Sequence, residues 1–74
     1  MKVGRQVERS QSPNGKHLLR IFRRDSSFYF VEISELTEKD ETFWIPTKES
    51  TFYESLDAAR SEAIATVAWL KEVI

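Results

Sequence analysis

The residue types that most often perform chemistry are scarce in this 74-residue chain, which has one histidine, His17, and no cysteine. A metal site or a nucleophilic relay needs several such groups converging on one point. His17 has neither a second histidine nor a thiol to join it, and the two glycines do not build a phosphate-binding motif. We therefore predict no catalytic residue, no metal ligand and no cofactor, in a protein that is not an enzyme.

Acidic side chains gather in one short segment, at Glu35, Glu38, Asp40 and Glu41. Carboxylates in a loop can bind Ca²⁺, but the spacing here differs from that of an EF-hand and no glycine stands at its centre. The segment is therefore predicted to be the solvated tip of a hairpin.

A third chemistry is suggested by arginines that stand close to aromatic residues. Single-stranded nucleic acids bind to sheets on which bases stack against aromatic rings while basic side chains follow the phosphates. The candidate contacts for this role are Arg20, Arg23, Arg24 and Phe30. Aromatic strands that pair in a homodimer produce the same pattern, and we favour the homodimer.

Three segments that could position these residues have the composition of strands, at residues 16–24, 27–36 and 42–47. Pro46 lacks an amide donor, so the third strand should end there or lie at a sheet edge. Residues 51–53 can add a few extended residues before the helix described next.

The stretch from Ser55 to Ile74 is predicted to be one helix, because Ser55 can cap the free amides, Asp57 lies in the first turn and neither Gly nor Pro follows. At about 100° per residue, one face of this helix is apolar. The members of this stripe are Leu56, Ala59, Ala63, Val67, Leu70 and Ile74, with Ile64 at its margin.

The order of these elements predicts an α+β fold, an antiparallel meander of three or four strands with one C-terminal helix packed on one face. Residues 15–74 form the single domain. Residues 1–14 are predicted to be a flexible basic tail, with a short edge strand through Val3 and Val7 as the alternative.

Side chains alternate between the two faces of a strand, so odd and even positions separate. The odd positions give an aliphatic face that suits the helix, made of Leu19, Ile21, Tyr29, Val31, Ile33, Phe43 and Ile45. The even positions give an aromatic face that one helix leaves uncovered. On the outer side of the helix, Trp69 either folds back onto Tyr53 or the sheet rim, or takes part in association.

Uncovered apolar surface on a small domain usually marks an interface. The predicted interface residues are Phe22, Phe28, Phe30, Trp44, Ala65, Trp69 and Val73.

Charge is divided unevenly along the chain although the net charge is only −1. Residues 1–24 carry seven basic and one acidic side chain, and the remainder carries four basic and eleven acidic ones. Clustered arginine and lysine can attract nucleic acid or an acidic partner. The favoured interpretation is that the basic strand lies beside acidic neighbours and is neutralised across the sheet.

The string FYESLDAARSEAI, at residues 52–64, resembles the strand-to-helix junction of HicB-like antitoxin domains. The resemblance implies a domain that binds another protein. The strand-then-helix order is also similar to that of single-stranded-DNA-binding coactivator domains that dimerise through their helices.

We expect a small non-enzymatic binding module that self-associates, since a chain of this size without disulfides gains stability from oligomerisation. The alternatives are single-stranded nucleic-acid binding and a HicB-like, protein-binding role. The absence of cysteine and of an apolar membrane or signal segment leads us to expect a soluble, cytoplasmic protein that does not associate with a membrane.

Overall fold

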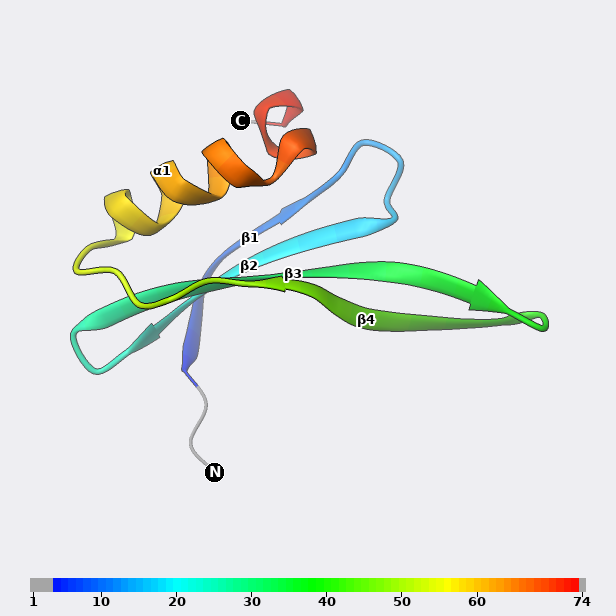
Figure 1. Ribbon diagram of the computed structural model, residues 1–74, viewed down its shortest axis with the longest axis horizontal. Coiled ribbons are helices and arrows are strands. Elements are labelled where there is room, and N and C mark those ends of the chain that lie inside the picture. The colour runs from blue at the N-terminus through cyan, green and yellow to red at the C-terminus, as the bar shows by residue number, and fades with distance from the viewer. Residues whose placement is uncertain (1–3, 74) are drawn as a thin grey trace.

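The computed structural model describes residues 4–73 as a four-stranded antiparallel sheet with helical segments on one side (Figure 1). The sheet is a meander in the order β1-β2-β3-β4, which confirms the predicted α+β architecture. The elements are β1 (Arg5–Gln11), β2 (His17–Arg24), β3 (Ser27–Glu38), β4 (Glu41–Glu49), α1 (Leu56–Thr66) and the 3₁₀ helix η1 (Ala68–Glu72). Within residues 4–73, no helix is long and apolar enough to cross a membrane.

The fourth strand of the sheet is β1, at the edge beside β2. Arg5–Gln11 therefore form an edge strand, as in the alternative prediction, and the prediction of a flexible tail is wrong for these residues. The register shifts between Gln6 and Glu8, so Val7 forms a bulge. Val3 lies outside the described residues. At the opposite edge, β4 continues through Pro46 to Glu49, which confirms that a strand containing this proline lies at an edge.

Two tight turns connect β2, β3 and β4. Arg24 pairs with Ser27, so only two residues separate β2 from β3. Lys39 and Asp40 separate β3 from β4, and both have positive φ angles, 50° and 67°. Positive φ at both central residues is the signature of the type I′ turn, whose twist matches that of a hairpin. After β4, residues 51–53 add no regular strand, but Tyr53 forms an isolated bridge with Phe28.

The short turn between β2 and β3 decides which residues face α1. Because two residues separate the strands, odd positions of β2 pair with even positions of β3, as Ile21 does with Phe30 and Leu19 with Glu32. Paired residues share a face. The predicted grouping of odd positions on both strands is therefore wrong for β3, and its aliphatic odd positions lie on the face turned away from α1.

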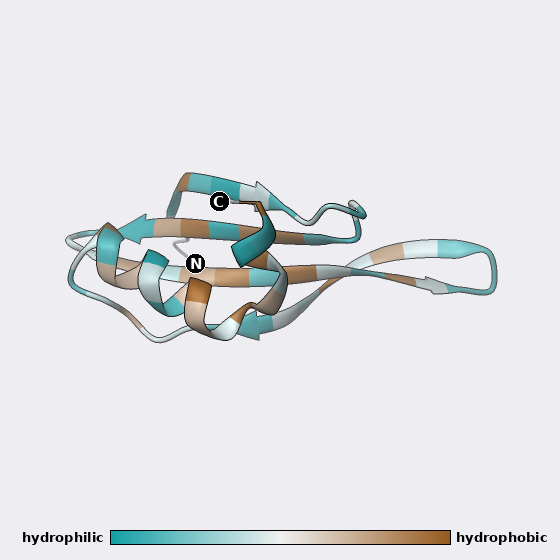
Figure 2. Cartoon of the chain, turned by 90° about the horizontal axis from the view of Figure 1, so that it is seen from above, coloured by the Kyte–Doolittle hydropathy of each residue, from teal (hydrophilic) through white to brown (hydrophobic). Residues whose placement is uncertain are grey.

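The core lies between the sheet and α1, where brown apolar positions gather in Figure 2. Ala59 and Ala63 are completely buried, and their small side chains let the helix backbone approach the sheet. The core residues are Leu19, Ile21, Phe30, Ala59, Ala63, Val67 and Leu70, with Leu56 and Ile64 partly buried beside them. The predicted stripe of Ala59, Ala63, Val67 and Leu70 is thus confirmed as the buried side of this segment.

The start of α1 is capped as predicted, since the Ser55 hydroxyl accepts a hydrogen bond of 3.1 Å from the amide of Ala58. The helix ends at Thr66, however, and Val67 is extended (φ −102°, ψ 99°), so one helix to Ile74 is wrong. Two β-branched residues in succession weaken the helix here. Lys48 also donates a hydrogen bond of 2.9 Å from Nζ to the carbonyl of Thr66. Ile74 lies outside the described residues.

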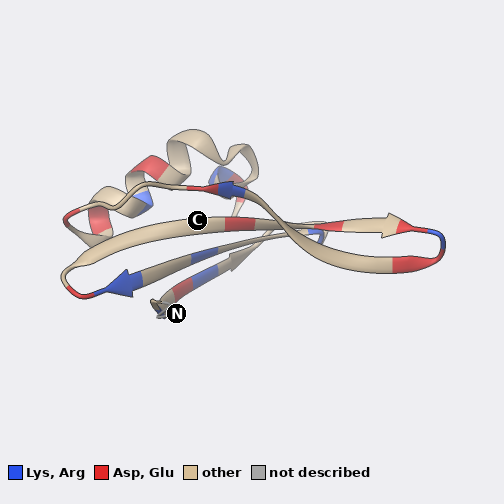
Figure 3. Ribbon diagram, turned by 60° about the horizontal axis from the view of Figure 1, so that its bottom comes forward, with Lys and Arg blue, Asp and Glu red and all other residues tan. Residues whose placement is uncertain are grey.

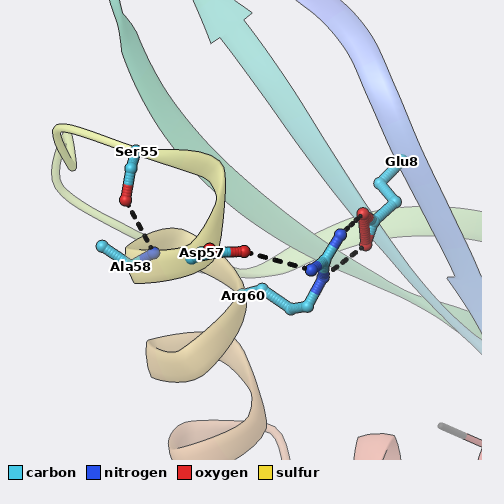
Figure 4. Close-up of polar contacts among 5 residues, drawn as sticks. All are labelled: Glu8, Ser55, Asp57, Ala58 and Arg60. Carbon is cyan, nitrogen blue, oxygen red and sulfur yellow. Dashed lines mark hydrogen bonds and ion pairs between the residues drawn. The ribbon is translucent and has the colours of Figure 1, made fainter.

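An ion pair ties α1 to the edge of the sheet (Figure 4). Arg60 donates from Nε to Oε2 of Glu8 over 3.1 Å and from its terminal nitrogen to Oε1 of the same carboxylate. It also approaches Asp57 at 3.4 Å. The pKa of Arg60 is raised by the hydrogen bond with Glu8 and by the negative charge of this carboxylate. The forked contact fixes the angle between α1 and β1.

The close approach of α1 to the sheet predicts different costs for two alanines of this helix. Ala63→Leu forces extra atoms into a filled core and should lower the free energy of unfolding by about 1 to 3 kcal/mol. Ala65→Leu, on the exposed side of the same helix, should change it by about 0.5 kcal/mol or less. Urea denaturation measures both, and an equal loss for the two variants would contradict the packing described.

Candidate functional site

The end of the β3–β4 hairpin projects beyond the rest of the sheet (Figure 1). The paired register of β2 with β3 ends at Ser34, and the amide of Glu35 donates a last hydrogen bond of 2.8 Å to the carbonyl of Lys16, so from Leu36 onward β3 pairs with β4 alone. We call the hairpin from Glu35 to Ile45 the arm. The rest of the sheet packs against the helical segments and forms the core. The arm is a two-stranded ribbon, and such a ribbon is at best marginally stable in isolation.

Large apolar side chains stand uncovered on both faces of the arm. Leu36 pairs with Phe43 on the face that continues the α1 side, and these side chains are 45% and 44% exposed. Ile45, on the same face, is 38% exposed. Trp44 pairs with Glu35 on the other face and is 43% exposed. The arm therefore offers apolar contact area that residues 4–73 leave unused.

The face of the sheet turned away from α1, which we call the open face, is half-buried and aromatic. Phe22 stacks on Tyr29 with ring centroids 5.2 Å apart, and Phe52 meets the edge of Tyr29 at 5.3 Å. A shallow hollow of about 380 Å³ lies here. Its lining residues are Arg20, Phe22, Tyr29, Val31, Ile33 and Glu49.

Arginines on β1 and β2 pair with one another across the sheet. Arg9 lies opposite Arg20, and Arg5 lies opposite Arg23. Like charges placed directly opposite each other destabilise a sheet. The expected neutralisation by acidic neighbours across the sheet is wrong at these positions, because the other neighbours of Arg20 and Arg23 on β3 are apolar.

No acidic side chain within residues 4–73 forms an ion pair with these arginines, since the ion pairs of this part of the chain all involve Arg60. The buried Nε of Arg20 also has no hydrogen-bond partner there. The open face therefore carries more positive than negative charge, since Glu49 lines the same hollow as Arg20 but no ion pair joins them within residues 4–73. Figure 3 shows basic segments on β1 and β2, with an acidic segment also on β1, and acidic segments on both sides of a basic one at the tip of the arm.

Trp69 turns inward, toward the sheet. Its Nε1 donates a hydrogen bond of 2.7 Å to Oε2 of Glu32, a buried carboxylate, and its ring stacks on His17 at 6.3 Å. Thr47 donates to the other oxygen of Glu32 over 3.2 Å. Of the two roles considered for Trp69, the structure has it folded back onto the sheet, where it satisfies a buried charge.

His17 and Ser34 form a second polar contact near Trp69, with 2.7 Å between Nδ1 and Oγ. A serine beside an imidazole can act as a nucleophile when a third group orients the imidazole. The carboxylate of Glu32 bonds Trp69 and Thr47 instead. Among residues 4–73, no group of three or more His, Asp or Glu side chains could hold a metal ion.

The predicted interface residues do not form one surface. Phe22 and Trp44 lie on the open-face side, in the body and the arm respectively. Phe30 is 2% exposed in the core, and Phe28 packs against that core. Phe30 is therefore excluded from any surface contact in this fold.

The remaining predicted residues are also separated. Ala65 and Val73 are exposed on α1 and after η1. Arg20 and Arg24 lie on the open face, whereas Arg23 lies on the other face and donates from Nε to the carbonyl of Asp25 over 2.9 Å. Sequence reasoning missed Tyr29 on the open face and Leu36 on the arm. It also assigned Phe43 and Ile45 to the face under the helix, but both are exposed on the arm. The two-residue turn after Arg24 was the signal that could have placed Tyr29.

Comparison of the chain with protein-family models, curated proteins and solved structures finds no match. The resemblance of residues 52–64 to HicB-like antitoxin domains therefore gains no support from a relative. The function has to be inferred from the geometry of the chain itself.

The inward position of Trp69 predicts that the hydrogen bond donated by its indole N–H contributes to the stability of the fold. Trp69→Phe removes the donor to buried Glu32 and should lower the free energy of unfolding by about 1 to 3 kcal/mol. The matched control Trp44→Phe, at an exposed position, should cost about 0.5 kcal/mol or less in the monomer. Denaturation of dilute samples tests this, and equal costs would contradict the inward role of Trp69.

Proposed function

We propose that this protein is a small binding module that associates with protein surfaces, and first of all with a second copy of itself. The observation that supports the proposal is the arm, which carries Leu36, Phe43, Ile45 and Trp44 uncovered. Apolar side chains gathered in this way are typical of an interaction site.

The size of the chain supports self-association on energetic grounds. A domain of this length buries only a modest core, and without disulfides its remaining means of stabilisation is association. A partner that covered the arm would bury apolar area on a ribbon that has little other support. The same absence of cysteine suits the reducing cytoplasm, where we place the module.

The contact is expected to use the faces of the arm more than its edge. β4 is an edge strand whose residues are all exposed, but Pro46 has no amide to donate and Lys48 adds a charge. Both features discourage strand-to-strand pairing along an edge. We therefore expect side chains on the faces of the arm to make the contact.

Self-association predicts a sedimenting species of about twice the 8.7 kDa chain mass at tens of micromolar protein. Trp44→Ser should weaken this dimer by at least about tenfold, because it removes a large exposed apolar side chain of the arm. Val7→Ser changes an equally exposed apolar residue on the β1 bulge and should leave the dimer intact. A clean 8.7 kDa monomer throughout this concentration range would contradict the proposal.

A second candidate function is the binding of single-stranded nucleic acid by the open face. The specific observation is that the uncompensated pair Arg9 and Arg20 lies on the same face as the stacked rings of Phe22 and Tyr29. Cationic groups beside aromatic rings are the elements that bind phosphates and bases. Phe30 has no part in this version, because it is buried.

Nucleic-acid binding predicts that a labelled oligonucleotide binds with an affinity that falls as salt rises. Tyr29→Ala should weaken binding about tenfold through lost stacking, and Arg20→Ala should reduce the salt dependence by about one unit of slope. Lys71→Ala, at an exposed basic residue of η1, is the matched control and should have little effect. Fluorescence anisotropy measures all three, and binding that does not depend on salt would eliminate this candidate.

A further inference from the structure

Acidic side chains gather on the arm, and basic side chains gather on the open face of the body. The arm carries Glu35, Glu38, Asp40 and Glu41 against the single base Lys39. The open face carries Arg9 and Arg20, paired with each other, and Arg24, against the single acid Glu49. None of these side chains forms an ion pair within residues 4–73. The molecule thus presents an acidic projection and a basic face (Figure 3).

Apolar groups accompany the charges at both places. On the arm, Trp44 lies on the open-face side beside Glu35. In the body, the hollow of about 380 Å³ has walls of Phe22, Tyr29, Val31 and Ile33. The arm thus offers a bulky exposed ring next to an acid, and the body offers an apolar hollow on a face with more basic than acidic side chains, so the two surfaces are complementary in shape and in charge.

We propose that two copies associate reciprocally, with the arm of each copy lying across the open face of the other. This inference rests on the self-association proposed above and states which surfaces meet. Trp44 then lies against the hollow of the partner. Glu35, on the same face of the arm as Trp44, and Asp40, in the turn of the arm, lie near Arg9 and Arg20 of the other copy.

The shape of the chain allows this arrangement to close at two copies. β3 runs without interruption from the body, where it pairs with β2, into the arm. A two-fold axis lying along the sheet and across β3 brings the two open faces together and sets each arm over the opposite body. Each contact is then made twice, as in an isologous dimer.

The molecule has enough surface to form a dimer of this kind. A stable dimer of standard size buries about 800 Å² on each partner. The described chain exposes 5295 Å² in total and is a flat body of 41 × 32 × 16 Å, so its broad faces are its largest surfaces. Both the hollow and the Trp44 side of the arm lie on one of these faces.

Electrostatic attraction favours the acidic arm of a second copy over an uncharged partner on the open face. Arg9 and Arg20 repel each other in the isolated chain, and an approaching carboxylate relieves that repulsion. Opposite charges on the two surfaces also speed and orient the encounter.

A charge exchange between two variants tests the arrangement. The arm variant carries Glu35→Lys with Asp40→Lys, and the face variant carries Arg9→Glu with Arg20→Glu. Each variant alone should dimerise at least about tenfold more weakly than the original chain, because its arm and face have charges of the same sign. An equimolar mixture should form a heterodimer, since both contacts are then between opposite charges.

Sedimentation of each variant and of the mixture gives the result, and circular dichroism verifies folding. A control variant with Glu62→Lys and Lys71→Glu changes exposed charges on α1 and η1 and should dimerise normally. If the original chain is a monomer, both this inference and the proposed function are overturned. If the original chain dimerises but the variants dimerise equally well, or the mixture does not recover, only the reciprocal arrangement is overturned.

Disulfide trapping provides a second readout that does not depend on reversing charges. The chain has no cysteine, so Trp44→Cys and Phe22→Cys can be introduced singly and the two proteins mixed under mild oxidation. The reciprocal arrangement predicts cross-links between the two proteins in preference to links between identical chains. Cross-linking of the Trp44→Cys chains to one another in preference would indicate edge-to-edge pairing of β4 and would overturn the inference. If the two proteins do not cross-link to each other and the chain binds a single-stranded oligonucleotide, the open face binds nucleic acid and not the arm, which also overturns the inference.

Discussion

The two-residue connection between β2 and β3 fixes the face on which every side chain of these strands lies. Since Arg24 pairs with Ser27, each odd position of β2 lies beside an even position of β3. Phe30 and Glu32 are thereby placed under the helical side, and Tyr29 is placed on the open face. A register different by one residue would exchange the two sets and expose the core.

The same register leaves β3 longer than β2. β2 ends at His17, which pairs with Ser34, while β3 continues to Glu38 and can pair only with β4. The arm follows from this difference in length, because no third strand or helix among residues 4–73 reaches its faces. Its uncovered apolar residues are therefore a consequence of how the strands pair, and they connect the fold directly to the proposed binding role.

The end of the chain shows how tertiary contacts can override a local pattern. The stripe from Ala59 to Leu70 is buried as expected, yet α1 stops at Thr66 and the chain turns before η1. The turn brings Trp69 over the sheet, where its indole satisfies Glu32. A buried carboxylate requires such a partner, so the break in the helix and the polar residue in β3 belong together.

The sequence by itself determined the features that depend on neighbouring residues: strands β2, β3 and β4, the two-residue turn between β2 and β3, the Ser55 cap and the small buried stripe of α1. The two-residue turn also determines the register of β3 against β2. The alternation of side chains along β3, taken alone, had assigned its odd positions to the wrong face. Only the tertiary structure decided the pairing of Arg9 with Arg20, the contact of Trp69 with Glu32 and the exposure of the arm. These join or separate positions far apart in the chain, where local propensity carries no information about distance.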